Sequence, residues 1–194
     1  MPAVSNSMGD MQAPSGPPDG LQYSDDAELA RRIAHGSRQA FRALVDRHGP
    51  YLYGVARAIA GSAEDAEDAV QEAFVAALTS RFRGESAVRT WLVKILVRRI
   101  GMMRRARRLR GREPLPQDLP APQRAADSSE ARLDVAQMLQ SLSPEHREVI
   151  VLREIEQMSY EQMAEALGVP RGTVESRLHR ARAALRRQYR GYQP

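Results

Sequence analysis

The sequence predicts an all-α protein made of two small helical domains that are joined by a flexible, Pro-rich linker. Apolar residues recur every three or four positions through residues 24–110 and again through residues 130–190, which is the spacing of one helix face. No segment of useful length alternates between polar and apolar residues as a half-buried strand would. The intervening residues 111–129 hold Gly111 and four prolines, a composition typical of an extended linker.

The beginning of the chain differs in composition from the rest. Residues 1–23 contain four Pro, three Gly and three Ser and show no apolar period, so we expect a disordered tail. The chain of 194 residues has room for one ordinary domain or two small ones. We therefore expect a tail (1–23), a first helical domain (24–110), a linker (111–129) and a second helical domain (130–190).

Within the first domain the periodicity predicts four helices. The first two are expected to be separated by a break near Gly49 and Pro50, and the second of them to end at Gly61. Two further helices are expected over residues 63–79 and 88–108.

The chain contains no cysteine. This excludes a disulfide-stapled scaffold, a Cys-ligated zinc or iron–sulfur site and a thiol nucleophile. No apolar run approaches the ~18–20 residues of a membrane span, and the N-terminus lacks the basic-then-apolar pattern of a signal peptide. We therefore expect a soluble, cytoplasmic protein.

The net charge of +5 is distributed very unevenly. Residues 86–112 carry +10 and residues 171–194 carry +6, whereas residues 113–170 carry −7. Solvated helix faces usually mix signs, so blocks of a single sign favour a polyanionic partner such as nucleic acid over an ordinary basic surface.

The most informative stretch is SYEQMAEALGVPRGTVESRL, residues 159–178. Ser159 and Gln162 form a capping box, Gly168 provides a turn, and Pro170 introduces a second helix. A short helix, a Gly-containing turn and a longer basic helix make up the helix-turn-helix layout, whose second helix enters the major groove of DNA. An ordinary helical hairpin with a basic surface is the alternative.

The second helix of this motif is expected to have one buried stripe. The apolar residues that share a face are Val174, Leu178, Ala181 and Leu185. Arg171 and Thr173 project from the N-terminal end of the helix, where base edges are read.

Two helices of the first domain carry unusual charge. In the segment EDAEDAVQEAF (64–74) and the residues that follow it, the apolar positions 66, 70, 73, 74, 77 and 78 share one face, and the carboxylates share the other, which suits a metal site or a solvated surface. No His lies on this helix, which argues against the metal site. The helix over residues 88–108 holds Trp91, the only tryptophan, beside Lys94. An aromatic ring beside cations suits stacking with unpaired bases, whereas a place in the core is the alternative for Trp91.

Taken together, these stretches resemble a bacterial RNA polymerase sigma factor of the compact, two-domain extracytoplasmic-function (ECF) group. The resemblance is carried in order by EDAEDAVQEAF (64–74), by FRGESAVRTWL (82–92) and by LSPEHREVIVLREIEQMSYEQMAEALGVPRGTVESRLHRARAAL (142–185). It extends over about residues 24–110 and 130–190.

The resemblance implies three interaction surfaces. The acidic helix would bind the coiled coil of the polymerase clamp through Asp65, Asp68, Gln71 and Glu72. The following loop and helix would hold an extruded base of the promoter −10 element and assist melting through Phe82, Arg83, Gly84, Ser86, Arg89, Trp91, Lys94 and Arg98. The helix-turn-helix would read the −35 element through Arg171, Gly172, Thr173, Ser176, Arg177 and Arg180.

The function implied is promoter selection and nucleation of melting by a dissociable subunit of core RNA polymerase, without catalysis, cofactor or metal. An anti-sigma partner is also expected from the resemblance, and such a partner could hold the chain at the membrane without any membrane insertion of its own. The length of the predicted linker fits this function. About 19 residues at ~3.3 Å each span at most ~63 Å, which is close to the length of ~18 base pairs at 3.4 Å per pair. The two domains could therefore reach two promoter elements that lie about that far apart.

Two other functions would account for parts of the sequence. A free-standing helix-turn-helix regulator that binds duplex DNA as a dimer would need neither the acidic helix nor the Trp-containing helix. A nucleic-acid enzyme is disfavoured because the sequence offers no credible carboxylate–His or nucleophile set.

Overall fold

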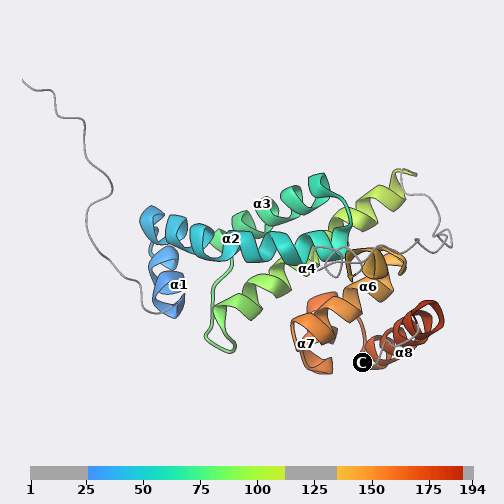
Figure 1. Ribbon diagram of the computed structural model, residues 1–194. Coiled ribbons are helices and arrows are strands. Elements are labelled where there is room, and N and C mark those ends of the chain that lie inside the picture. The colour runs from blue at the N-terminus through green and yellow to red at the C-terminus, as the bar shows by residue number, and fades with distance from the viewer. Residues whose placement is uncertain (1–25, 112–134, 190–194) are drawn as a thin grey trace, which may run out of the picture.

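The computed structural model describes residues 26–111 and 135–189, and every regular element in these ranges is helical, as the sequence predicts. The predicted tail (1–23) and all but the first residue of the predicted linker (111–129) lie outside the described residues. The helices form two lobes that pack against each other (Figure 1).

The N-terminal lobe consists of α1 (Asp26–Ala34), α2 (Arg38–Ala60), α3 (Ala63–Thr79) and α4 (Val88–Leu109). The long helix α2 packs against all three of the others, and α3 also packs along α4. Most of the buried residues of α3 are alanines, and these small side chains allow the neighbouring helices to approach closely. The predicted helices over 63–79 and 88–108 are therefore confirmed to within one residue.

The break between the first two helices is not where the sequence predicts it. The chain turns at Gly36, which has φ 83°, and Ser37 then caps α2 by accepting a hydrogen bond from the backbone N–H of Ala40. α2 continues through Gly49 and Pro50 without a break. An internal proline costs a helix ~3 kcal/mol, and the buried apolar residues on both sides of Pro50 offset that cost. The predicted end at Gly61 is confirmed.

The C-terminal lobe begins with helical residues 135–140 and continues with α6 (Pro144–Ile150), which runs into a wider π-helical turn, η1 (Val151–Ile155). Two more helices, α7 (Tyr160–Leu167) and α8 (Arg171–Gln188), complete it. α8 packs against both α6 and α7.

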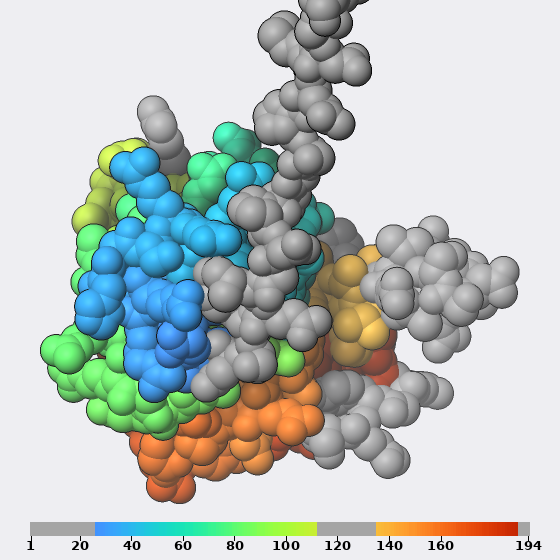
Figure 2. Space-filling model, turned by 90° about the vertical axis from the view of Figure 1, so that its left-hand side faces the viewer, coloured from blue at the N-terminus to red at the C-terminus, as the bar shows by residue number. Residues whose placement is uncertain are grey.

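The two lobes are in direct contact. α7 rests on α4, and α6 and η1 rest on α2. Figure 2 shows the orange surface of the C-terminal lobe directly against the green surface of α4. The buried apolar residues of the two lobes form one continuous cluster. The sequence predicts two domains on a tether and gives no expectation of this packing.

Gly61 lies at the boundary between the lobes, where a larger residue is expected to destabilise the fold. It has φ 89°, and a Cβ atom at this position would lie 2.7 Å from the guanidinium Nη1 of Arg147. Gly61→Ala is expected to lower the free energy of unfolding by about 1–2 kcal/mol, because a left-handed backbone is strained for a residue with a Cβ. Gly54, in the middle of α2, has open space around its Cβ position. Gly54→Ala is the control and should stabilise by about 0.5–1 kcal/mol. Urea unfolding followed by circular dichroism measures both changes, and equal effects would contradict the prediction.

Candidate nucleic-acid and polymerase interfaces

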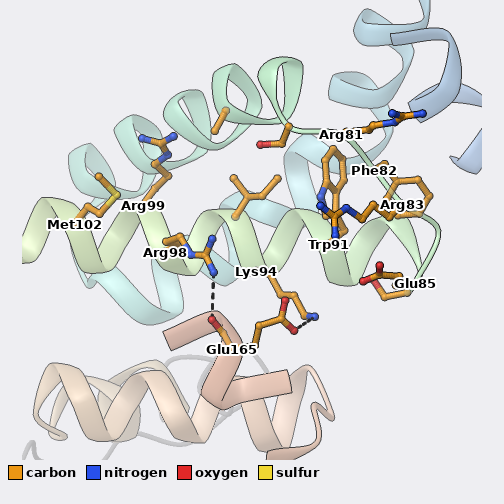
Figure 3. Close-up of a pocket in the computed structure, with 14 residues that line it drawn as sticks. Arg81, Phe82, Arg83, Glu85, Trp91, Lys94, Arg98, Arg99, Met102 and Glu165 are labelled. Atoms are coloured by element: carbon orange, nitrogen blue, oxygen red, sulfur yellow. Dashed lines mark hydrogen bonds and ion pairs between the residues drawn. The ribbon is translucent and has the colours of Figure 1, made fainter. Parts of the chain in front are cut away.

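An open groove lies at the start of α4. The loop before α4 carries Phe82, whose ring meets that of Trp91 edge-on with centroids 5.3 Å apart. Both rings are half-buried and pack on the core, and both also line the groove (Figure 3). The two interpretations of Trp91, core residue and groove residue, are therefore compatible.

Two basic residues extend the groove along α4. Lys94 and Arg98 follow Trp91 on one side of the helix and reach the first helix of the helix-turn-helix (Figure 3). The Nζ of Lys94 lies 2.5 Å from Oε2 of Glu165, and Arg98 donates a hydrogen bond of 3.3 Å to the backbone carbonyl of Glu165. Glu165 of α7 thus borders a groove that otherwise belongs to the N-terminal lobe.

Arg89 lies apart from this groove, against α2. Its guanidinium carbon is 3.8 Å from the centre of the Tyr51 ring, and it also donates a hydrogen bond to the Tyr51 hydroxyl. The same hydroxyl donates to the carboxylate of Glu156 in the C-terminal lobe. Burial and the hydrogen bond to Glu156 raise the pKa of Tyr51 to about 12. The hydroxyl therefore keeps its proton at neutral pH and joins Arg89 to Glu156.

The remaining residues predicted for this site lie in the loop. Arg83 and Gly84 are exposed, and Ser86 is half-buried with its hydroxyl donating to the carbonyl of Ala87 at 3.3 Å. Gly84 has φ 77°, so its lack of a side chain permits the turn. The structure thus brings most of the predicted set to one groove, whereas Gly84 lies in the exposed loop beside it and Arg89 contacts Tyr51. The predicted residues that line the groove are Phe82, Arg83, Ser86, Trp91, Lys94 and Arg98.

The helix-turn-helix has the local structure that the sequence predicts. Both hydrogen bonds of the capping box between Ser159 and Gln162 are present. Gly168 ends α7 with φ 64°, and α8 begins immediately after Pro170. The four residues of the predicted stripe on α8 are its buried residues, namely Val174, Leu178, Ala181 and Leu185.

The N-terminal end of α8 is exposed and polar. Arg171 pairs with Glu161 at 2.6 Å and with Glu175 at 2.8 Å, so its guanidinium has a defined position at the helix start. These carboxylates raise the pKa of Arg171, and the hydrogen bond that Arg171 donates to Glu175 is the largest cause. Ser176 is exposed and donates its hydroxyl to the carbonyl of Thr173.

The other predicted residues of α8 differ in exposure. Gly172 and Arg180 are exposed. Arg177 is half-buried and lines a second groove, between the lobes, together with Arg104 and Glu148. Arg177 therefore faces the lobe boundary, whereas Gly172 and Arg180 face solvent.

The acidic helix α3 presents part of its predicted face to solvent. Asp68, Gln71 and Glu72 are exposed. Asp65 instead forms a two-pronged ion pair with Arg107 of α4, and the hydrogen bonds from Arg107 are the main cause that lowers the pKa of Asp65. Two aliphatic residues extend the exposed face, Val75 with 63% and Leu78 with 48% of its surface accessible. The sequence pattern placed Leu78 on the buried face, which the structure contradicts.

Sequence reasoning also missed the residues that join the two lobes. Glu148 is 1% exposed and pairs with Arg104, with 3.1 Å between Oε2 and Nη2. Glu156 and Glu165 make the other contacts described above. The available signal was the charge pattern itself, because a −7 block and a +10 block in one chain can neutralise each other.

Across residues 26–111 and 135–189, no group of three or more His, Asp or Glu side chains is arranged to hold a metal ion. In the same part of the chain, no helix combines the length and the apolar character that crossing a membrane requires.

Comparisons with known proteins match both lobes. Residues 44–110 match Sigma-70 region 2, and residues 132–185 match Sigma-70, region 4. The chain is 36% identical over 171 residues to the ECF RNA polymerase sigma factor SigM of Mycobacterium tuberculosis, covering 87% of this chain and 86% of SigM.

Two solved structures are also similar. CnrH, in complex with the cytosolic domain of CnrY, has a TM-score of 0.55 and 35% identity, with 84% of this chain and 95% of that chain covered. The sigma factor RpoE of Bartonella quintana, in complex with the anti-sigma factor NepR, has a TM-score of 0.58 and 26% identity over 79% of this chain and 98% of that one. A free-standing helix-turn-helix regulator would account for only the second of the two family matches. The chain therefore belongs to the ECF group of RNA polymerase sigma factors, which direct transcription initiation at specific promoters.

Proposed function

We propose that this sigma factor divides promoter recognition among three surfaces of the described structure. The groove of Phe82, Trp91, Lys94 and Arg98 binds the unpaired strand of the −10 element. The exposed start of α8 reads the −35 duplex, and the exposed face of α3 binds core RNA polymerase. The observation that carries the proposal is the groove, where two aromatic rings lie beside two cations.

Strand separation at the −10 element requires no nucleotide hydrolysis in this scheme. An extruded base can stack on an aromatic ring, and stacking is worth ~1–3 kcal/mol per base. Lys94 and Arg98 attract the backbone phosphates of the same strand. Binding energy to the single strand thus offsets the few kcal/mol needed to unstack a base pair, and the chain performs no catalysis and needs no cofactor.

At the −35 element, α8 lies in the major groove with its N-terminal end toward the bases. Arg171 can donate two hydrogen bonds to a guanine, and its contacts with Glu161 and Glu175 orient it beforehand. Gly172 lets the backbone approach closely, and Thr173 and Ser176 offer hydroxyl groups. Arg180 lies further along the exposed side and binds phosphate.

Polymerase binding is assigned to the exposed part of α3. Asp68, Gln71 and Glu72 supply charge and hydrogen-bonding groups, and exposed Val75 and Leu78 supply adjacent apolar area. Asp65 has a different role within this set, because its ion pair with Arg107 holds α3 against α4.

An anti-sigma partner is proposed as well, because CnrH and the sigma factor RpoE were both solved in complexes with another protein. RpoE is there bound to an anti-sigma factor. The place of action proposed for this chain is the cytoplasm, where polymerase and promoter DNA meet.

Two single variants test the division between the −10 and −35 sites. Trp91→Ala holoenzyme is expected to bind promoter DNA but to show at least ~10-fold lower permanganate reactivity of −10 thymines, because one stacking contact is lost. Arg171→Ala holoenzyme is expected to bind promoter DNA more weakly and to gain less from a −35 element, because a base contact is lost. Once bound, it should melt the −10 element normally. Footprinting and permanganate probing on the same promoter fragment measure both.

The variants act as controls for each other. Trp91 is half-buried, so its variant must first show an unchanged helical circular dichroism spectrum at the assay temperature. Normal melting by folded Trp91→Ala holoenzyme would return Trp91 to a purely structural role. An unchanged response of Arg171→Ala to the −35 element would contradict the assignment of α8.

A further inference from the structure

The two lobes meet through oppositely charged side chains. Four basic residues of α4 contact the C-terminal lobe, namely Lys94, Arg98, Arg104 and Arg108. The acidic residues that they meet belong to α6 and α7, namely Glu145, Glu148 and Glu165. The +10 block of the sequence is thus partly neutralised by the −7 block of the same chain.

These contacts follow α4 over much of its length. Near its start, Lys94 lies 2.5 Å from the carboxylate of Glu165. Near its end, Arg108 lies 2.6 Å from Glu145. Beyond this row, Tyr51 joins Arg89 to Glu156, as described above. The interface therefore engages basic residues from the first turn of α4 to the last.

The cations engaged near the start of α4 are those assigned above to promoter DNA. A phosphate that binds Lys94 would lie beside the Glu165 carboxylate at the same ammonium group, and the two anions would repel each other at such short range. Glu165 also borders the groove of Phe82 and Trp91 (Figure 3). The C-terminal lobe and a single DNA strand thus compete for one surface.

We propose that the free chain is self-inhibited: the acidic face formed by Glu145, Glu148, Glu156 and Glu165 occupies the basic face of α4 and excludes single-stranded DNA until the lobes separate. The inference rests on the proposed role of the α4 groove. In the free protein, the C-terminal lobe of the same chain covers that groove.

The contact is suited to being reversible. The Lys94–Glu165 and Arg108–Glu145 pairs are partly exposed, with 63% of the Glu165 side chain and 47% of the Arg108 side chain accessible. Exposed ion pairs are individually weak and are screened by salt. The pair of Glu148 and Arg104 is much less accessible and contributes more to holding the lobes in register.

The state of the interface can be measured by the distance between the lobes. Because the chain has no cysteine, Ala63→Cys on α3 and Arg186→Cys on α8 provide two unique exposed positions for a donor and an acceptor dye. In this labelled chain, the double variant Glu156→Gln, Glu165→Gln is expected to change the energy transfer efficiency toward that of separated lobes, and high salt should act in the same direction. Lys94→Glu combined with Glu165→Lys reverses the ion pair and should restore the efficiency lost with Lys94→Glu alone.

The matched control is Glu154→Gln. Glu154 lies in the same lobe and pairs with Arg182 of that lobe, so its replacement removes a carboxylate without touching the contact with α4. A short fluorescent single-stranded DNA, added to the free proteins, should bind the Glu156→Gln, Glu165→Gln variant at least ~3-fold more tightly than the control, because affinity scales with the open fraction. Energy transfer that is unchanged in the double variant and in high salt would overturn the inference that this acidic face holds the lobes together reversibly.

The DNA measurement separates this inference from the proposed function. If the lobes open but the DNA affinity only matches that of the Glu154→Gln control, the C-terminal lobe does not compete with single-stranded DNA for the groove, and the inference is overturned. If Trp91→Ala leaves the DNA affinity of the opened double variant unchanged, the proposed groove itself fails, whereas the closed state still stands on the energy transfer alone.

Discussion

Arg147→Met is expected to lower the free energy of unfolding by about 3–5 kcal/mol, because it leaves several buried carbonyl groups without a donor. The Arg147 side chain is buried and donates from Nε to the carbonyl of Leu139 at 2.8 Å. Its Nη2 donates to the carbonyls of Gln140 and Leu142, both at 3.2 Å. Its Nη1 donates to the carbonyl of Ile59 in the N-terminal lobe at 3.3 Å. One guanidinium therefore closes the start of the C-terminal lobe and ties it to the end of α2.

Arg153→Met is the matched control for this prediction. Arg153 belongs to η1 in the same lobe and donates to a single carbonyl, that of Met158, at 2.8 Å. The same substitution there removes one charged hydrogen bond and should cost about 1.5–3 kcal/mol at most. Urea unfolding of both variants gives the comparison. A cost for Arg147→Met no greater than that for Arg153→Met would show that water replaces the guanidinium at the lobe boundary.

The parts of the fold that the sequence predicts correctly are those that depend on local contacts. The capping box of Ser159 and Gln162 and the left-handed Gly168 act within a few residues, so the helix-turn-helix can be derived from the chain itself. The break between α1 and α2 was misplaced at Gly49 and Pro50 because a local rule against internal proline was given more weight than packing. Gly36 carries the actual turn.

The contact between the lobes could not be predicted from local sequence patterns. Lys94 and Glu165 are separated by 71 residues, and Tyr51 and Glu156 by 105 residues. Ion pairs of this kind depend on how two finished lobes pack, and no local pattern encodes which cation meets which carboxylate. The charge blocks were visible in the sequence, but they were interpreted as two surfaces facing DNA. The structure uses Arg104, Arg107 and Arg108 within the protein itself.

The polymerase site proposed on α3 shows a similar division. The helical pattern of α3 correctly separates a buried face from an acidic one, so Asp68, Gln71 and Glu72 emerge exposed. It does not reveal that Asp65 is engaged by Arg107, because that partner lies 42 residues away. The exposed Val75 and Leu78 also depend on where the neighbouring helices end, which the sequence pattern alone does not specify.

Asp68→Arg combined with Glu72→Arg is expected to weaken the binding of core RNA polymerase by roughly 100-fold or more. If α3 meets a basic surface of the polymerase, this double reversal replaces two attractions with two repulsions, and like charges placed together at an interface cost several kcal/mol. Both residues are exposed on α3, so the fold should tolerate the change. Co-purification with core polymerase and a titration with labelled variant measure the loss.

The specificity of that effect depends on a control with the same change in charge. Glu28→Arg combined with Asp46→Arg also replaces two carboxylates of the N-terminal lobe, but on α1 and α2 rather than on α3. If long-range attraction to the polymerase were the whole cause, both double variants would lose affinity equally, and the assignment of α3 would fail. Loss confined to Asp68→Arg, Glu72→Arg would instead identify a short-range contact, because surface charges more than about 8–10 Å from the interface are largely screened. Repeating both titrations at higher salt then separates the two terms: the control should converge on the wild-type affinity, while the α3 variant stays weak.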